Sequence, residues 1–192
     1  MSKYGKQSVD WFEALVNKIG GVERADAFLR GELVLALPSQ LTWPPKLKID
    51  RSNPYDPVAS VGQNWKIGEE DIRAHSIVEF DVQKIILQTG LNEGEAVVTG
   101  EVKRTRLVSQ AIQLDAKVAQ TLFEEKGQVT LRWMHEHLNV TWIEFLGTVL
   151  VGPNGYRFAL DLRRSVDGSW GWYCYWLDFD RGANSSAVGL AS

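Results

Sequence analysis

The chain has 192 residues and a net charge of −3, with 44% hydrophobic and 23% charged residues. A chain of this length suits one domain and buries enough surface to fold without disulfides. The acidic balance argues against a dedicated duplex DNA-binding protein, which presents a basic face. The single cysteine, Cys174, excludes an internal disulfide and favours the cytoplasm. Because no apolar run is long enough to cross a bilayer, we predict one cytoplasmic domain over residues 1–192 with no membrane segment.

The first predicted element is a helical pair over residues 8–30. Apolar residues recur at helical spacing from Trp11 to Ile19, and Ser8 is placed to cap this helix. Gly20 and Gly21 interrupt the pattern. A second apolar stripe follows and ends before Gly31. We interpret the pair as a packing hairpin rather than a DNA-reading motif.

Residues 38–68 differ in composition from the rest of the chain. Five of the six prolines lie here, at positions 38, 44, 45, 54 and 57. Proline fixes φ and removes an N–H donor, so the stretch predicts a long irregular connection.

Residues 77–138 combine a strand-like segment with helices. Residues 77–91 alternate as a strand does. Thr99 can cap a helix that runs to about Ser109, but residues 97–107 also suit a strand, and both interpretations stay open. Asp115 caps a clearer helix that ends at Gly127, and residues 129–138 predict a shorter one.

The segment 142–192 predicts a β meander that is rich in tryptophan. The expected strands are 142–151, 156–164 and 170–177, with a short edge strand at 187–190. Asp167-Gly168 is a strong hairpin dipeptide because both central residues of the favoured turn take positive φ. The fold class is therefore α+β, with the N-terminal and central helices packed on one face of a mainly antiparallel sheet.

The C-terminal run Asp167–Trp172, followed by Trp176-Leu177 and Ser186–Val188, resembles the C-terminus of small hypothetical proteins from bacteria with very reduced genomes. Residues 19–32, 114–118 and 146–150 are similar to the same group. The resemblance implies no activity.

The two faces of the meander give the leading functional hypothesis. Side chains alternate along a strand, and Cys174 shares a face with the tryptophans of the third strand, so that face is predicted to be inward. The opposite face carries tyrosine, arginine and acidic residues, which are typical of an interaction surface. We predict a non-catalytic module that binds another protein or itself through Glu144, Arg157, Asp161, Arg163, Tyr173 and Tyr175.

Two other functions remain open. The same face, extended by Lys103, Arg104, Arg106 and Arg132, suits single-stranded nucleic acid, which is bound by stacking and phosphate contacts. Alternatively, the chain is a small enzyme of an unrecognised class that uses Asp178 or Asp180 as a carboxylate site.

No motif in the sequence indicates a cofactor or a metal. His135-Glu136-His137 lacks the spacing of a zinc-protease helix, since residues two apart diverge on a helix. Cys174 has no base in its neighbourhood in the sequence, so we interpret it as a core residue rather than a nucleophile.

Overall fold

The computed structural model describes Val16, residues 21–30 and residues 43–190. The chain divides into two compact units, residues 1–42 and 43–192. In the first unit the helix α2 spans Val22–Leu29, which confirms the second helix of the predicted pair. The first predicted helix lies outside the described residues. That both units form one domain stays a prediction.

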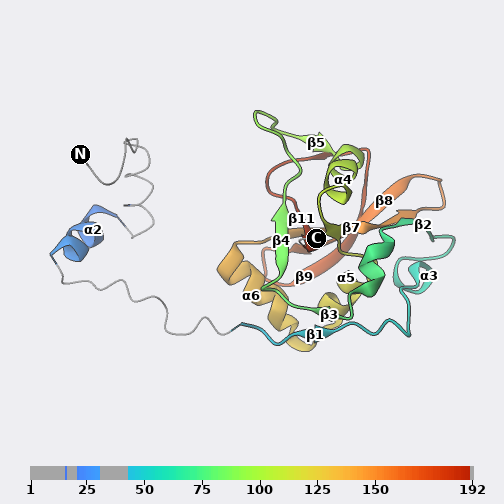
Figure 1. Cartoon of the computed structure of the whole chain (residues 1–192), viewed down its shortest axis with the longest axis horizontal. Coiled ribbons are helices and arrows are strands. Elements are labelled where there is room, and N and C mark those ends of the chain that lie inside the picture. Colours follow the sequence, from blue (N-terminus) through green and yellow to red (C-terminus); the bar gives the residue numbers. More distant parts are fainter. Residues whose placement is uncertain (1–15, 17–20, 31–42, 191–192) are drawn as a thin grey trace. The chain divides into compact units, whose positions relative to one another are not determined.

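The second unit contains helices and a mainly antiparallel seven-stranded sheet, so the chain is α+β (Figure 1). Five strands follow one another in the order β4-β11-β7-β8-β9. Among the described strands, only β11 and β7 are parallel neighbours. The bounds are Ile85–Gln88 for β4, Ser186–Leu190 for β11, Trp142–Val151 for β7, Arg157–Arg164 for β8 and Trp170–Trp176 for β9.

The remaining strands are short. β2 (Lys66–Glu70) pairs with the end of β7, and β6 (Ile112–Gln113) pairs with β11. Two small ladders join β1 (Leu47–Lys48) to β3 (Glu79–Phe80) and β5 (Val98–Thr99) to β10 (Asp180–Arg181). β7 bulges between Phe145 and Val149, and there Gly147 allows the strand to approach Leu114, whose carbonyl accepts its N–H.

Local sequence signals explain the helix starts. Thr99 caps α4 (Gly100–Val108), which decides the open choice at residues 97–107 in favour of a helix. Asp115 caps α5 (Ala116–Glu124) through a 3.0 Å bond from the Val118 N–H, as predicted. The other helices are α3 (Pro57–Ser60), η1 (Ile72–Ser76), η2 (Lys126–Gln128) and α6 (Val129–Leu138).

Helices cover both faces of the sheet. α4 reaches one face, where its Lys103 contacts Glu144. α5 reaches the other, where its Phe123 contacts Trp172. We call these the Glu144 face and the Trp172 face. The prediction that the central helices share one face is wrong, since a ten-residue strand buried along most of its length needs cover on both sides.

Three further expectations need correction. The segment 38–68 is not irregular throughout, because β1, α3 and the start of β2 lie in its described part. Residues 77–91 form two short strands, β3 and β4, rather than one. The predicted edge strand near residue 188 is instead an inner strand, because β11 lies between β4 and β7.

Candidate functional site

The six residues of the predicted interaction surface share the Glu144 face. Glu144 is directly opposite Asp161, and Asp161 is opposite Tyr173. Residues in one cross-strand row point to the same side, and alternation along each strand adds Arg163, Tyr175 and Arg157. The prediction that these side chains lie together on one side of the sheet is confirmed.

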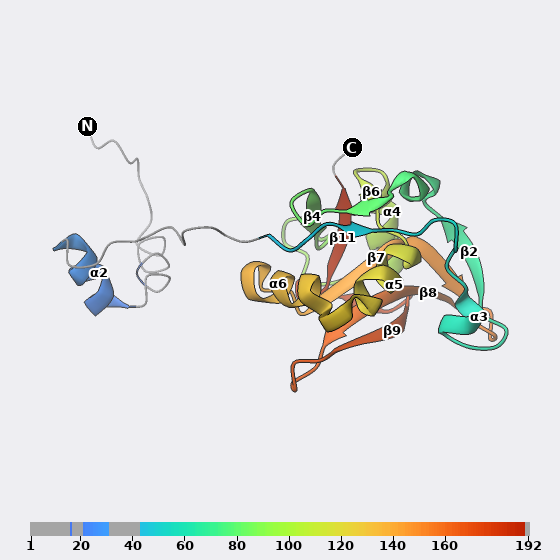
Figure 2. The ribbon, with the colours of Figure 1, turned by 90° about the horizontal axis from the view of Figure 1, so that it is seen from below.

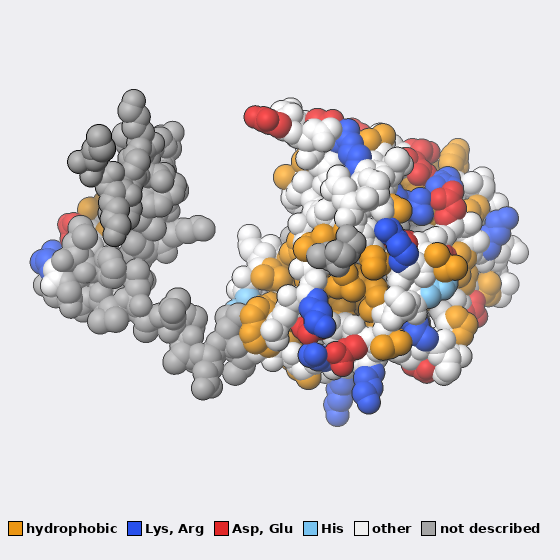
Figure 3. All heavy atoms as spheres, viewed as in Figure 1, with side chains coloured by type: hydrophobic (Ala, Val, Ile, Leu, Met, Phe, Trp, Pro, Cys, Tyr) orange, Lys and Arg blue, Asp and Glu red, His pale blue; other side chains and the backbone are white. Residues whose placement is uncertain are grey.

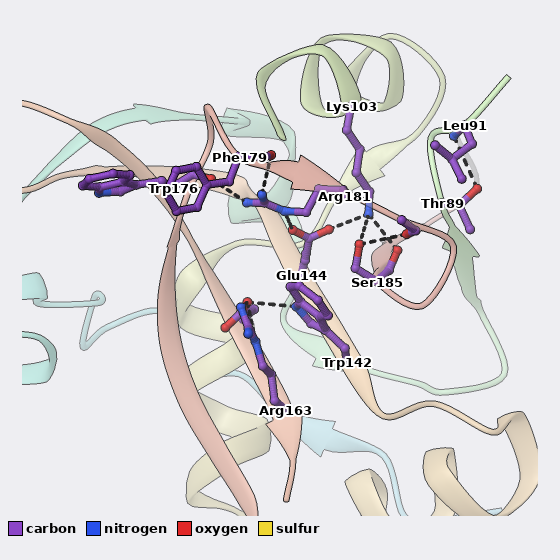
Figure 4. A network of polar contacts seen from close by, with 12 residues as sticks. Thr89, Leu91, Lys103, Trp142, Glu144, Arg163, Trp176, Phe179, Arg181 and Ser185 are labelled. Carbon is purple, nitrogen blue, oxygen red and sulfur yellow. Dashed lines mark hydrogen bonds and ion pairs between the residues drawn. The ribbon is translucent and has the colours of Figure 1, made fainter. Parts of the chain in front are cut away.

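This face is not, however, open to solvent as predicted. Glu144 is 0% exposed and lies at the centre of a buried charge network (Figure 4). Its Oε2 lies 2.5 Å from Lys103 Nζ, and its Oε1 accepts a bond from Arg181 Nε. Lys103 also donates to the backbone carbonyl and the hydroxyl of Ser185. Burial lowers the pKa of Lys103, and the Glu144 carboxylate opposes that effect.

Asp161 is likewise buried, at 1% exposure. Its Oδ2 accepts bonds from Trp142 Nε1 at 2.8 Å and from Arg163 Nη2 at 2.6 Å. Its Oδ1 is buried without a hydrogen-bond partner among the described residues. Burial raises the pKa of Asp161 to about 6, although Arg163 acts in the opposite direction. Glu144 and Asp161 therefore anchor cations inside the fold and are not surface contacts.

Guanidinium groups alternate with aromatic rings along the same face. Arg163 lies 3.8 Å from the ring centre of Trp142 and 4.5 Å from that of Tyr175. Arg181 lies 4.1 Å from the ring centre of Tyr175. Each such contact is worth about 0.5–2 kcal/mol, depending on how far it is desolvated. The aromatic and arginine residues that suggested an interface mostly stabilise one another.

Arg157 and Tyr173 occupy the margins of the face. Arg157 pairs with Glu101 of α4 and with Glu69 of β2, and these bonds raise its pKa. Tyr173 is 46% exposed, and Arg163 retains a partly exposed side chain. The accessible part of the predicted surface is therefore reduced to Tyr173 and the partly exposed side chains of Arg157 and Arg163.

The cations of the nucleic-acid hypothesis do not form a free basic patch. Lys103 is fully buried against Glu144. Arg104 pairs with Glu69, and Arg106 pairs with Glu95. Arg132 is exposed but belongs to α6 rather than α4. On the face of the 43–190 unit seen in Figure 3, lysine and arginine side chains are interspersed with acidic ones.

The carboxylates of the enzyme hypothesis are exposed near β10. Neither Asp178 nor Asp180 lines the cavities of about 170, 340 and 370 Å³ in the 43–190 unit. His135 and His137 each face a backbone carbonyl of their own segment. Among the described residues no group of three or more His, Cys, Asp or Glu side chains is placed to hold a metal ion.

The last strand of the sheet presents an unpaired edge. β9 pairs with β8 alone and lies at the margin of the sheet (Figure 2). Leu177 N–H bonds to the Arg157 carbonyl, and Ser165 N–H bonds to the Ser169 carbonyl. In this register the odd-numbered residues of β9 bond to β8. The N–H and C=O groups of Trp170, Trp172 and Cys174 therefore point outward, with no partner in the described part of the chain.

A cavity of about 370 Å³ lies beside this edge on the Trp172 face. Its walls come from α3, α5 and β9, and its lining residues are Ala59, Ser60, Gln120, Phe123, Glu124 and Trp172. The Phe123 and Trp172 rings are 5.6 Å apart. Tyr55 also packs against Trp172. The hydroxyl of Tyr55 is buried, and burial raises the pKa of Tyr55. The free edge and this cavity together form the candidate site.

Sequence reasoning missed the cavity because its residues lie far apart along the chain. Phe123 belongs to α5, and the sequence predicts that Trp172 faces inward with the core. Trp172 is in fact half-buried, whereas Trp170 is buried. An available signal was the lack of charge and proline from Trp170 to Trp176, which is unusual for an edge strand.

Comparisons with known proteins add no assignment. No protein-family model, no curated protein and no solved structure matches the chain. The resemblance of the C-terminal segment to small proteins of reduced-genome bacteria therefore stays a prediction. Within the described residues, no helix is both long enough and apolar enough to cross a membrane.

Proposed function

We propose that the chain is a non-catalytic protein-binding module that takes an extended segment of a partner protein as an additional strand along β9. The observation that carries this proposal is the outward-facing, unpaired backbone of Trp172 and Cys174 beside a cavity. Strand addition of this kind obtains its affinity from main-chain hydrogen bonds and its specificity from pockets that receive alternate side chains.

The composition of β9 supports this function. Exposed edge strands usually carry lysine, proline or a bulge, because an unprotected edge pairs with other chains. β9 has seven residues, none of them charged and none of them proline, and its pairing with β8 is regular. An edge without these protections is best explained if a strand covers it when the protein functions.

The side chains that flank the edge also suit a protein partner. Tyr173 is exposed on the Glu144 face, and the guanidinium of Arg163 lies 5.3 Å from its ring centre and 4.5 Å from that of Tyr175. Tyrosine and arginine are enriched at interface positions that contribute most of the binding energy. Because Arg163 is held by Asp161, this flank is preorganised and little side-chain entropy is lost on binding.

The test uses peptides selected on the full chain from a random library of 12-residue linear peptides. Their affinities are then measured for Cys174→Pro and for the matched control Cys174→Ser. Proline removes the outward N–H and is tolerated on edge strands. Binding should therefore be lost in Cys174→Pro and retained in Cys174→Ser. Equal binding by both variants would contradict strand addition.

Hydrogen exchange of the wild-type chain provides a second measurement that does not depend on the stability of the proline variant. The amides of Trp172 and Cys174 face outward, whereas those of Tyr173 and Tyr175 already bond to β8. Peptide binding should slow exchange at the first pair and leave the second pair slow throughout. Protection elsewhere in the chain, without a change at Trp172 and Cys174, would place the site away from β9.

A further inference from the structure

We infer that the β9 edge selects basic segments, because the cavity beside Trp172 is a subsite for an arginine side chain of the added strand. This inference rests on the proposed function and names the partner for it: an extended peptide with an arginine at the position opposite Trp172. The argument depends on where that side chain must lie and on what surrounds it.

The direction of the added side chain follows from strand geometry. Residues directly opposite each other in neighbouring strands point to the same face, with Cβ atoms about 4.5–5.5 Å apart. Trp172 pairs with Leu162 of β8 and points to the face covered by α5. The partner residue on the other side of Trp172 must therefore also point to that face. The indole of Trp172 lines the cavity, so the added side chain lies next to it.

The cavity combines aromatic walls with one carboxylate. Phe123 and Trp172 provide two rings whose planes are inclined by 41°. Glu124 is the only charged group among the described residues that line it, and its Oε1 accepts a 2.9 Å bond from Gln120. The other oxygen, Oε2, has no hydrogen bond within the described part of the chain. Apolar walls with a carboxylate at the rim fit a long side chain with a cationic head.

Arginine fits this arrangement better than lysine. Its planar guanidinium stacks on an aromatic face and also forms directed bonds to a carboxylate, whereas the lysine head group is a compact and strongly hydrated point charge. The aliphatic stem can pack against Ala59 and Phe123 while the head reaches Glu124. The net charge of −3 of the whole chain also favours a basic partner.

A second copy of this chain fits the subsite less well than a separate partner. If β9 of one copy paired with β9 of another, only residues of that strand would face the cavity. None of the residues from Trp170 to Trp176 is cationic. Self-association through β9 would therefore leave Glu124 without a cationic partner, and the occupant that matches the cavity is a basic segment of another protein.

The experiment measures fluorescence anisotropy with labelled 11-residue peptides that alternate threonine and valine around one central position. That position carries arginine, the isosteric neutral residue citrulline, or glutamine. The proteins are the wild-type chain, Glu124→Gln, and Glu136→Gln as a control that removes another exposed charge, from α6. Sedimentation of the same samples reports whether copies of the chain associate.

The wild-type chain should bind the arginine peptide about tenfold more tightly than the citrulline peptide, as expected for a stacked and paired guanidinium. Glu124→Gln should remove most of this preference without weakening the citrulline peptide, and Glu136→Gln should keep it. If the three peptides bind equally, the arginine subsite is wrong while strand addition stands. A preference that survives in Glu124→Gln also overturns the subsite.

If none of the peptides binds, both the arginine subsite and strand addition along β9 are overturned. If sedimentation shows a dimer that Cys174→Pro abolishes, the occupant is a second copy, and the inference of a basic partner is overturned. The peptide affinities therefore distinguish failure of the subsite from failure of strand addition, and sedimentation of Cys174→Pro beside the other proteins identifies self-association.

Discussion

The substitution Glu144→Gln tests whether the buried charge network is held together by a single carboxylate. Glu144 contacts both Lys103 and Arg181, and all three side chains are fully buried. Glutamine has nearly the same shape but no charge. The variant therefore retains two cations in the interior and removes the anion between them, without creating a cavity.

The expected cost is large because neither cation can reach water. Removing one partner of a buried ion pair typically costs about 3–5 kcal/mol, most of it from the charge left uncompensated. Arg181 retains bonds to the carbonyls of Phe179 and Trp176, and Lys103 retains Ser185, so we expect the lower half of that range. For a chain of this size, a loss of about 3–4 kcal/mol lowers Tm by roughly 6–16 °C.

The dependence on pH gives the test a specific signature. Burial lowers the pKa of Lys103 below 10.5 in the folded chain, and Glu144 is the group that raises it. Without Glu144 the folded pKa falls further, so the unfolded state binds more protons between that value and 10.5. Stability then rises with pH across this window. The free energy of unfolding of Glu144→Gln should therefore differ least from that of the wild-type chain at pH 10 and most at pH 7.

The assay is urea denaturation at pH 7 and pH 10, followed by tryptophan fluorescence. Glu95→Gln is the matched control, because it breaks an ion pair with Arg106 that is accessible to solvent. Glu95→Gln should lower the free energy of unfolding far less than Glu144→Gln does, and its loss should be the same at pH 7 and pH 10. A loss below about 1 kcal/mol for Glu144→Gln at pH 7, or equal losses at both pH values, would refute this account of the network.

Three further predictions concern other residues of the sheet. Asp161 has a folded pKa of about 6, above its usual 3.8, so its contribution to stability is complete below 3.8 and is lost as the pH rises through 6. Between pH 5 and pH 8 the wild-type chain should therefore lose about 1 kcal/mol relative to Asp161→Asn in urea denaturation, and a constant difference would contradict this. Gly147→Ala should lower the free energy of unfolding by about 1–3 kcal/mol in the same assay, because the alanine Cβ would lie 2.3 Å from the Gln113 carbonyl oxygen. An unchanged denaturation midpoint would mean that the backbone of the β7 bulge shifts to accommodate the methyl group. Burial raises the pKa of Cys174 to about 12, so its thiol should react with a disulfide reagent at pH 8 far more slowly in the native chain than in urea, and equal rates would show that the thiol is accessible.

The elements of the second half of the chain were largely predictable from local patterns. Thr99 and Asp115 start their helices through side-chain bonds to the third following N–H, an interaction that needs only a few neighbouring residues. Asp167-Gly168 lies in the turn between β8 and β9 as predicted, but only Gly168 takes a positive φ, of +88°, so the expectation that both residues do is wrong. Strand alternation also placed Glu144, Asp161 and Tyr173 on one face.

Other features could not be predicted from local patterns. β11 was expected at an edge, yet it lies between β4 and β7, because strand order depends on contacts between distant segments. The same limit applies to Lys103. A lysine on a charged helix is normally solvated, and its burial follows from the position of Glu144 forty-one residues later.

Alternation in the sequence determines which side chains share a face of the sheet, because the pleat repeats every two residues whatever surrounds the strand. Whether that face meets water is decided only by the tertiary structure. α4 and β10 bring Lys103 and Arg181 onto the face that carries Glu144, and the result is a buried charge network instead of an open surface. The tertiary structure likewise leaves the backbone of β9 unpaired beside a cavity, because no other described strand reaches that edge.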